Sequence, residues 1–166
     1  MKRLIPVLLS TLFSIFIVRH AEKVATKGTD NPPLTKAGAR RAQELARVLS
    51  SVPLKAVYAT EFARTQQTAA PAAKQAGVPV EQRPADKTAE LAAELRAKHA
   101  DDDVLVVAHS DTIGELVKAL GAPDAIGELP SAEYDNLFVV DLQPKGARLH
   151  RLHYGAASAA KISPSK

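Results

Sequence analysis

Four short apolar runs recur along the chain, and each is followed by a stretch with helical periodicity. The runs are rich in β-branched residues and have no polar alternation, which is typical of strands buried on both faces of a sheet. In chain order they cover residues 15–18, 56–59, 78–80 and 104–108. Two later runs, residues 137–142 and 148–154, flank a Pro-Lys-Gly turn and predict a β-hairpin.

The stretches between these runs predict amphipathic helices, because apolar residues recur in them every three or four positions. In chain order the predicted helices run from a cap at Thr35 to about residue 50, from a cap at Thr60 to about residue 75 with Gly77 closing the helix, over residues 87–99, and from a cap at Ser110 or Asp111 to Gly121. Strands that alternate with helices predict an α/β fold, with three α/β/α layers and a mostly parallel central sheet.

The two ends of the chain differ from this pattern. Residues 1–14 begin with Lys2 and Arg3 and continue as an apolar leader, which is typical of a signal peptide or a membrane-associated segment. We therefore expect export to the periplasm, with membrane contact only through an uncleaved leader. A cytoplasmic location is the alternative, because no small-x-small cleavage site follows. Residues 155–166 are mostly small and predict a flexible tail, so that residues 15–154 form the domain.

Composition excludes several classes of protein. The chain has no cysteine, so that neither a disulfide framework nor a zinc-thiolate site can form. Its net charge of +4 does not come from a basic block with interleaved aromatic residues, and we predict no nucleic-acid partner. The pair Arg40 and Arg41 is interpreted as part of an exposed helix face. The oligomeric state is left open.

Reactive side chains follow three of the predicted strands. Arg19 and His20 end the first, Arg64 lies in the turn or helix after the second, and His109 ends the fourth. Ligands of parallel sheets bind at the carboxyl ends of the strands, so these side chains converge if the three strands are neighbours. A neutral imidazole is a nucleophile towards phosphorus, and arginine binds phosphate oxygens bidentately. Such a cluster needs no metal or other cofactor to hold a phosphoryl group.

Four ordered motifs resemble those of the histidine phosphatase superfamily, which has the phosphoglycerate-mutase-like fold. The chain has Arg-His-Ala-Glu-Lys at residues 19–23, where the family has an Arg-His-Gly motif, and Pro-Leu-Thr-Lys-Ala-Gly at residues 33–38. Residues 60–68 fit a variant of Ser-x-x-x-Arg-x-x-x-Thr that begins with Thr60, and Ala-His-Ser at residues 108–110 stands where the family has Gly-His-Ser or Gly-His-Gly. Four motifs in the correct strand context are far more specific than any one alone. The resemblance spans about residues 15–154 and indicates a compact phosphatase member.

By this resemblance, His20 would be the nucleophile that becomes phosphorylated, and Arg19, Arg64 and His109 would bind the transferring phosphoryl group. The resemblance implies a metal-independent hydrolase, a phosphomonoesterase that acts through a phosphohistidine intermediate. Its substrate would be a small phosphate ester or a phosphoprotein.

The proton donor to the leaving group is less clear. Larger members of the family carry a Glu in an insertion after the third strand, which this chain lacks. We predict Asp86 as the donor because it is the nearest carboxylate in that region, with Asp111 as the alternative. Lys23 and Ser110 are further candidates for substrate binding. Without a clear acid, a non-catalytic module of the cell envelope that binds phosphate ligands is an alternative function, and a phosphomutase is less favoured because the chain lacks a lid.

Overall fold

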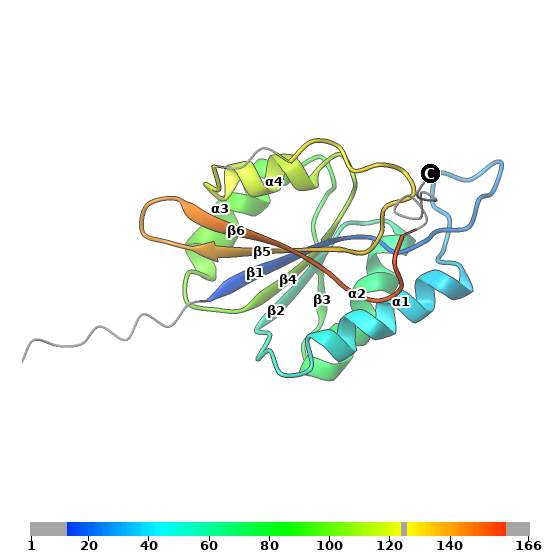
Figure 1. Cartoon of the computed structure of the whole chain (residues 1–166), viewed down its shortest axis with the longest axis horizontal. Helices are drawn as coiled ribbons and strands as arrows, with labels where there is room; N and C mark the ends of the chain where they lie inside the picture. The colour runs from blue at the N-terminus through cyan, green and yellow to red at the C-terminus, as the bar shows by residue number, and fades with distance from the viewer. Residues whose placement is uncertain (1–12, 124–125, 159–166) are drawn as a thin grey trace, which may run out of the picture.

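A computed structural model describes residues 13–123 and 126–158. Its six strands form one sheet in the order β3-β2-β4-β1-β5-β6 (Figure 1). The pairs β1–β4, β2–β4 and β2–β3 are parallel, whereas β5 is antiparallel to β1 and β6. The strands are β1 (Ser14–Arg19), β2 (Ala56–Ala59), β3 (Val80–Gln82), β4 (Val104–Ala108), β5 (Asn136–Leu142) and β6 (Ala147–His153).

Helices cover both faces of this sheet. On one face lie α1 (Lys36–Val48) and α2 (Ala63–Ala76), and on the other lie α3 (Thr88–Lys98) and α4 (Ile113–Ala119) (Figure 1). Successive residues of a strand enter opposite cores, since Ile17 packs with α3 and α4 while Val18 packs with α1 and α2. The predicted three-layer, mostly parallel α/β fold is therefore confirmed.

Strands β2 and β4 have the predicted bounds, but the third strand is displaced by two residues. The sequence predicts residues 78–80, and β3 covers Val80–Gln82. The cause is the end of α2, where Gly77 adopts a left-handed conformation with φ of 71°. The next amide, on Val78, then donates to the carbonyl of Ala73 and closes the helix, so that Val78 is not available for the sheet.

Two helices begin later than predicted. The N-cap of α2 is Phe62 rather than Thr60, and the N-cap of α4 is Thr112 rather than Ser110 or Asp111. Neither cap residue makes a side-chain capping hydrogen bond. The hydroxyl of Thr60 bonds instead to two other side chains, which are described with the site.

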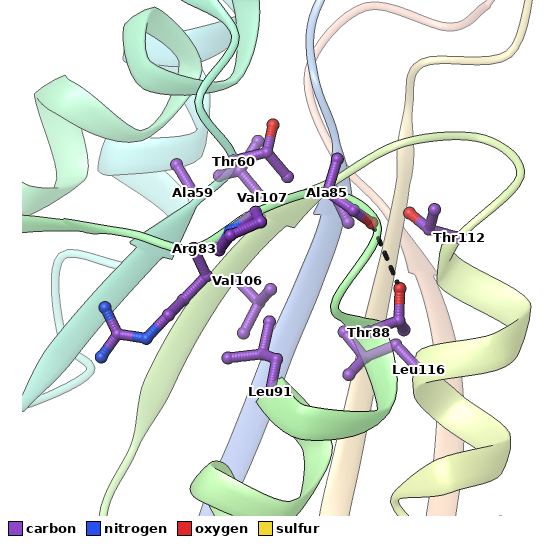
Figure 2. A pocket seen from close by; sticks show the side chains of 12 residues that line it. Ala59, Thr60, Arg83, Ala85, Thr88, Leu91, Val106, Val107, Thr112 and Leu116 are labelled. Atoms are coloured by element: carbon purple, nitrogen blue, oxygen red, sulfur yellow. Dashed lines mark hydrogen bonds between the residues drawn. The ribbon is translucent and has the colours of Figure 1, made fainter.

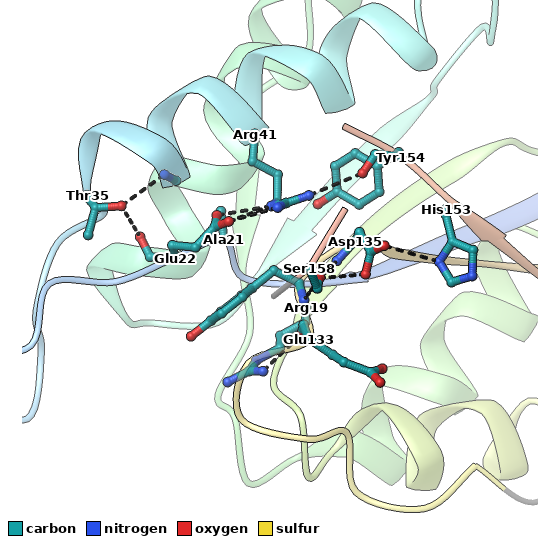
Figure 3. Close-up of polar contacts among 12 residues, drawn as sticks. Arg19, Ala21, Glu22, Thr35, Arg41, Glu133, Asp135, His153, Tyr154 and Ser158 are labelled. Atoms are coloured by element: carbon teal, nitrogen blue, oxygen red, sulfur yellow. Dashed lines mark hydrogen bonds and ion pairs between the residues drawn. The ribbon is translucent and has the colours of Figure 1, made fainter. Parts of the chain in front are cut away.

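Arg41 was expected on an exposed face of α1, and this expectation is wrong. Its side chain is buried and binds both carboxylate oxygens of Glu22 (Figure 3). It also donates to the carbonyl of Tyr154, at the end of β6. A buried guanidinium requires such partners, and Arg41 thereby ties α1 to two distant segments.

The start of the predicted flexible tail is packed rather than free. Ser158 is buried, and its hydroxyl donates to the carboxylate of Asp135 at 2.6 Å while accepting from the amides of Tyr134 and Asp135 (Figure 3). Residues 159–166 lie outside the described residues, as do residues 1–12 of the predicted leader. Within the described ranges, no helix is long and apolar enough to span a membrane.

Candidate active site

The carboxyl ends of β1, β4 and β2 meet at one edge of the sheet, because these strands are parallel neighbours. Arg19 pairs with Ala108 across β1 and β4, which places His20 beside His109. The two imidazole rings have their centroids 5.5 Å apart. The strand order thus brings together His20, at the end of β1, and His109, at the end of β4, as the sequence predicts.

His20 is buried, and its Nδ1 lies 2.8 Å from the carbonyl oxygen of Ala21. A carbonyl can only accept, so this contact assigns the proton of the neutral ring to Nδ1 and the lone pair to Nε2. Burial lowers the pKa of His20 to about 3, and the charge of Arg19 acts in the same direction. His20 is therefore neutral at physiological pH and presents Nε2 as a nucleophile.

The segment after His20 is held by helix α2. The amide of Ala21 donates to the hydroxyl of Thr68 at 2.9 Å, and that hydroxyl donates to the carbonyl of Arg64 at 2.7 Å. Ala21, whose carbonyl accepts from His20, is thereby held through its amide as well.

The Pro-Leu-Thr-x-x-Gly motif holds the same segment from the other side. Thr35 donates its amide to the carbonyl of Glu22 at 2.8 Å, and its hydroxyl accepts from the amide of Gly38 at 3.0 Å (Figure 3). A Cβ on Gly38 would overlap the main chain of Glu22, so only glycine lets α1 approach so closely. Arg41, one turn further on, binds the carboxylate of Glu22 at 2.8 Å. The motif therefore anchors the chain directly behind the nucleophile.

Arg19 is held in place by main-chain carbonyls. Its Nη1 donates to the carbonyl oxygens of Pro130, Ser131 and Glu133 at 2.9–3.1 Å. Its guanidinium carbon lies 4.3 Å from the centre of the Tyr134 ring. Burial lowers the pKa of Arg19, but an arginine remains charged in a protein. Its buried Nε has no hydrogen-bond partner among the described residues.

Arg64 is less enclosed than Arg19. It lies in the first turn of α2, is partly exposed, and donates from Nη1 to the carbonyl of Asp30 at 3.3 Å. Its guanidinium carbon lies 4.3 Å from the centre of the Phe62 ring. Its Nε, like that of Arg19, is buried without a partner in the part of the chain that the structure describes. Both arginines thus carry donors that a bound anion could use.

His109 is buried beside Arg64 and is held by a hydroxyl. Its Nε2 lies 2.9 Å from Oγ1 of Thr60. Burial lowers the pKa of His109 to about 4, and the positive charge of Arg64 contributes. The Phe62 ring meets the His109 ring edge to face at 5.3 Å.

The predicted proton donor, Asp86, is exposed on the turn before α3. Among the described residues, no hydrogen bond or ion pair joins it to the cluster, so its role stays a prediction. Asp111 is also exposed. Burial lowers the pKa of Arg19, Arg64 and His109, and the charge of Asp111 opposes this shift in each, which places Asp111 within electrostatic reach of all three.

The two remaining candidates lie at the rim. Lys23 is exposed and forms an isolated β-bridge with Leu34. Ser110 is partly exposed, and its carbonyl accepts from the amide of Leu129. Within the described ranges, no group of three or more His, Cys, Asp and Glu side chains is arranged to hold a metal ion.

A small pocket lies between the ends of β2 and β4 and the helices α3 and α4 (Figure 2). Thr60 stands on its wall, and Thr88 lies opposite, with its hydroxyl bonded to the carbonyl of Ala85. Most of the lining is apolar, including Ala59, Leu91, Val106, Val107 and Leu116.

Sequence reasoning missed several residues that support the cluster. Thr65 lies three positions before Thr68, the last residue of the motif at residues 60–68, and on the same face of α2, a spacing that could have indicated a shared role. Thr60 was interpreted as a helix cap. Tyr134 and the carbonyls of residues 130–133 come from a loop without any periodic pattern, and no local signal marks them.

Comparisons with known proteins were made for sequence and for structure. Residues 15–85 match the family model of the histidine phosphatase superfamily (branch 1). No curated protein sequence gives a significant match.

Solved structures of similar fold include several phosphatases. The protein histidine phosphatase SixA, in complex with tungstate, is 22% identical with a TM-score of 0.68, over 91% of this chain and 100% of that chain. A SixA protein from Nakamurella multipartitia is 26% identical with a TM-score of 0.62, over 87% and 97% of the two chains. A mycobacterial glucosyl-3-phosphoglycerate phosphatase with inorganic phosphate is 17% identical with a TM-score of 0.65, over 87% and 98%.

Proposed function

We propose that the chain is a member of the histidine phosphatase superfamily and a metal-independent phosphomonoesterase whose nucleophile is His20, and the family model over residues 15–85 supports this. One observation carries this proposal. A neutral imidazole, with its proton held on Nδ1 by a carbonyl, lies beside a second histidine and two arginines at adjoining strand ends.

In the first step, the lone pair on Nε2 of His20 attacks phosphorus, and the bond from phosphorus to the leaving oxygen breaks. Negative charge on the equatorial oxygens is met by Arg19, Arg64 and His109, which do the electrostatic work often given to a metal. The Ala21 carbonyl accepts from Nδ1 throughout and stabilises the positive charge that develops on the ring of His20. The leaving oxygen takes a proton from a carboxylic acid.

In the second step, water attacks the phosphohistidine, the bond from phosphorus to Nε2 breaks, and inorganic phosphate leaves. The proton of the water returns to the carboxylate that released one before, so that the cycle balances. We favour Asp111 of the two candidate acids, because its charge acts on Arg19, Arg64 and His109.

The substrate class is a phosphate monoester on a small molecule or a phosphorylated protein side chain, phosphohistidine included. Similar structures bear the names of a protein histidine phosphatase and of a sugar-phosphoglycerate phosphatase, so the fold alone does not select between them.

The test is hydrolysis of p-nitrophenyl phosphate in the presence of EDTA. We expect turnover to persist, and a brief incubation with labelled phosphate ester, quenched in alkali, to leave label on the protein. The His20→Ala variant should retain neither turnover nor label. Activity that EDTA abolishes and a divalent ion restores would contradict the proposal, and phosphate binding without turnover would point to a non-catalytic binding module.

We further propose that the leader directs export, on the basis of its basic start and apolar run. Ser14 is the first residue of β1, and it donates to Asp103 and Asp141. Processing before Ser14 would keep these bonds, whereas processing after it would remove them. N-terminal sequencing of the protein from cell fractions tests this: an intact leader in the cytoplasmic fraction would refute export.

A further inference from the structure

Three side chains next to the site form a chain of hydrogen bonds that ends on His109. Oγ1 of Thr65 lies 2.7 Å from the carbonyl oxygen of Phe62, Oγ1 of Thr60 lies 2.8 Å from Oγ1 of Thr65, and Nε2 of His109 lies 2.9 Å from Oγ1 of Thr60. Thr60, Thr65 and His109 are all buried, so water cannot readily replace these bonds.

The number of available protons decides which group donates in each of these hydrogen bonds. The chain's three shortest contacts need three protons, and the two hydroxyls supply only two. Oγ1 of Thr65 also lies 3.1 Å from the carbonyl oxygen of Thr60, which is a second, more distant acceptor for the same proton. A carbonyl cannot donate, so the proton of Thr65 goes to Phe62. The proton of Thr60 must then bridge to Thr65, and the contact with His109 is left for a proton on Nε2.

The reverse direction leaves one contact without a proton. If Thr60 donated to His109 and Thr65 donated to Thr60, two oxygens at 2.7 Å, on Thr65 and Phe62, would face each other with no hydrogen between them. A separation of 2.7 Å is typical of an O–H···O hydrogen bond and not of two bare acceptors.

We propose that Thr60 and Thr65 form a hydroxyl relay that holds His109 as its Nε2–H tautomer, which leaves Nδ1 as the ring nitrogen that takes a proton from a bound phosphate monoanion and then donates it to a phosphoryl oxygen in a hydrogen bond. Thr60 is then a positioning residue that acts through His109. The inference rests on the proposed function for the identity of the ligand, but not for the tautomer.

The matched variants are Thr60→Val, which keeps the shape and removes the hydroxyl, and Thr60→Ser, which keeps the hydroxyl. Thr88→Val is the control, because Thr88 lines the same pocket and bonds to Ala85 rather than to His109 (Figure 2). Circular dichroism establishes that each variant is folded.

The primary readout is the ¹⁵N NMR spectrum of histidine-labelled protein, in which the signals of His109 are those lost in His109→Gln. We expect a protonated Nε2 and a bare Nδ1 on His109 in the wild type, in Thr60→Ser and in Thr88→Val. In Thr60→Val the Nε2–H would be a buried donor without a partner, which shifts the tautomer ratio by about tenfold towards Nδ1–H.

The second readout is kinetic. We expect kcat/KM for p-nitrophenyl phosphate and affinity for vanadate to fall about tenfold in Thr60→Val, and to stay within about twofold in Thr60→Ser and Thr88→Val. A wild-type His109 with its proton on Nδ1, or an unchanged tautomer in Thr60→Val, would overturn the relay. If the wild type hydrolyses no phosphate ester, the proposed function fails, while the NMR result still decides the tautomer.

Discussion

The site has two halves of similar composition that are built in different ways. The β1 half contains Arg19 and His20, and the half at β2 and β4 contains Arg64 and His109. In each half, the arginine lies 4.3 Å from the centre of an aromatic ring. The β1 half is held almost entirely by main-chain carbonyls, from Ala21 and from residues 130–133. The other half is held by side-chain hydroxyls and by one carbonyl.

This difference separates two tasks. Main-chain carbonyls are fixed by the fold, and they hold His20 with its proton on Nδ1 and its lone pair on Nε2. Side-chain hydroxyls, on our proposal, hold His109 in the opposite tautomer. Covalent chemistry needs a nucleophile of constant geometry, while the partner half binds an anion whose charge and shape change during the reaction. We therefore assign the covalent bond to the β1 half and the binding of the phosphoryl oxygens to the other.

The largest expected effect is the contrast between the two histidines. His20→Ala should lower turnover of aryl phosphates by about four orders of magnitude or more, because no other group can take the phosphoryl bond. His109→Ala should lower turnover by about 10²- to 10³-fold, as for loss of one electrostatic donor. Alkaline-quench labelling checks this assignment: label should be absent in the first variant and present in the second. Label retained only in His20→Ala would reverse the roles of the two halves.

The two arginines sharpen the comparison. Arg19→Lys should reduce kcat by about 10²-fold, because lysine cannot bond three carbonyls and still present a planar fork to phosphate. Arg64→Lys should cost less, about tenfold, because Arg64 is partly exposed and bonded to one carbonyl. Steady-state kinetics on one aryl phosphate measure both variants. Equal losses would mean that the number of main-chain contacts does not govern the contribution of each arginine.

The acid should belong to the half that contains His109. A proton donor matters greatly for an alkoxide leaving group and little for an acidic phenol, so Asp111→Asn should lower turnover of alkyl phosphates by about 10²-fold and spare p-nitrophenyl phosphate. Asp86→Asn is the matched variant, and the sequence alone predicts the loss there. If Asp86→Asn shows the selective loss, the prediction from sequence is right. The charge of Asp111 would then act on the cluster without Asp111 serving as the proton donor.

The sequence predicts the strand ends well because β2 and β4 are uninterrupted apolar runs, and the rule for parallel sheets then gathers Arg19, His20, Arg64 and His109 at one edge. The sequence did not establish that β1, β2 and β4 are neighbours, because the strand order depends on long-range pairing that no local pattern encodes. The displaced third strand shows the limit at a smaller scale, since the closure of α2 after Gly77 uses Val78, which the pattern assigns to the sheet.

The supports of the site were not predictable in the same way. The carbonyls that hold Arg19 lie more than 110 positions away along the chain, in a loop whose residues carry no periodic signal. Thr60 is the first residue of the motif at residues 60–68 and resembles an ordinary cap, but its contact with His109 is visible only in the structure. A strand-end rule locates reactive side chains, but it does not reveal what orients them.

The smallest expected effect concerns stability at low pH, and it also compares the two halves. In the native protein the pKa of His20 is about 3 and that of His109 about 4, whereas an exposed histidine has a pKa near its ordinary 6.5. Between these values the unfolded chain binds protons that the native protein does not, so the free energy of unfolding falls as pH falls below 6.5. At pH 5 each histidine should account for roughly 2 kcal/mol of that fall.

Urea unfolding at pH 7 and pH 5 measures the fall, with His20→Gln and His109→Gln as the matched variants. Each variant should lose part of the pH dependence, since glutamine does not titrate. The two variants should be alike between pH 6.5 and 5 and separate only below about pH 4, where native His109 takes up its proton before His20 does. If His109→Gln keeps the full wild-type pH dependence, His109 is protonated in the native protein near its ordinary pKa. Burial would then lower the histidine pKa in the β1 half alone, and the two halves would be alike only in their composition.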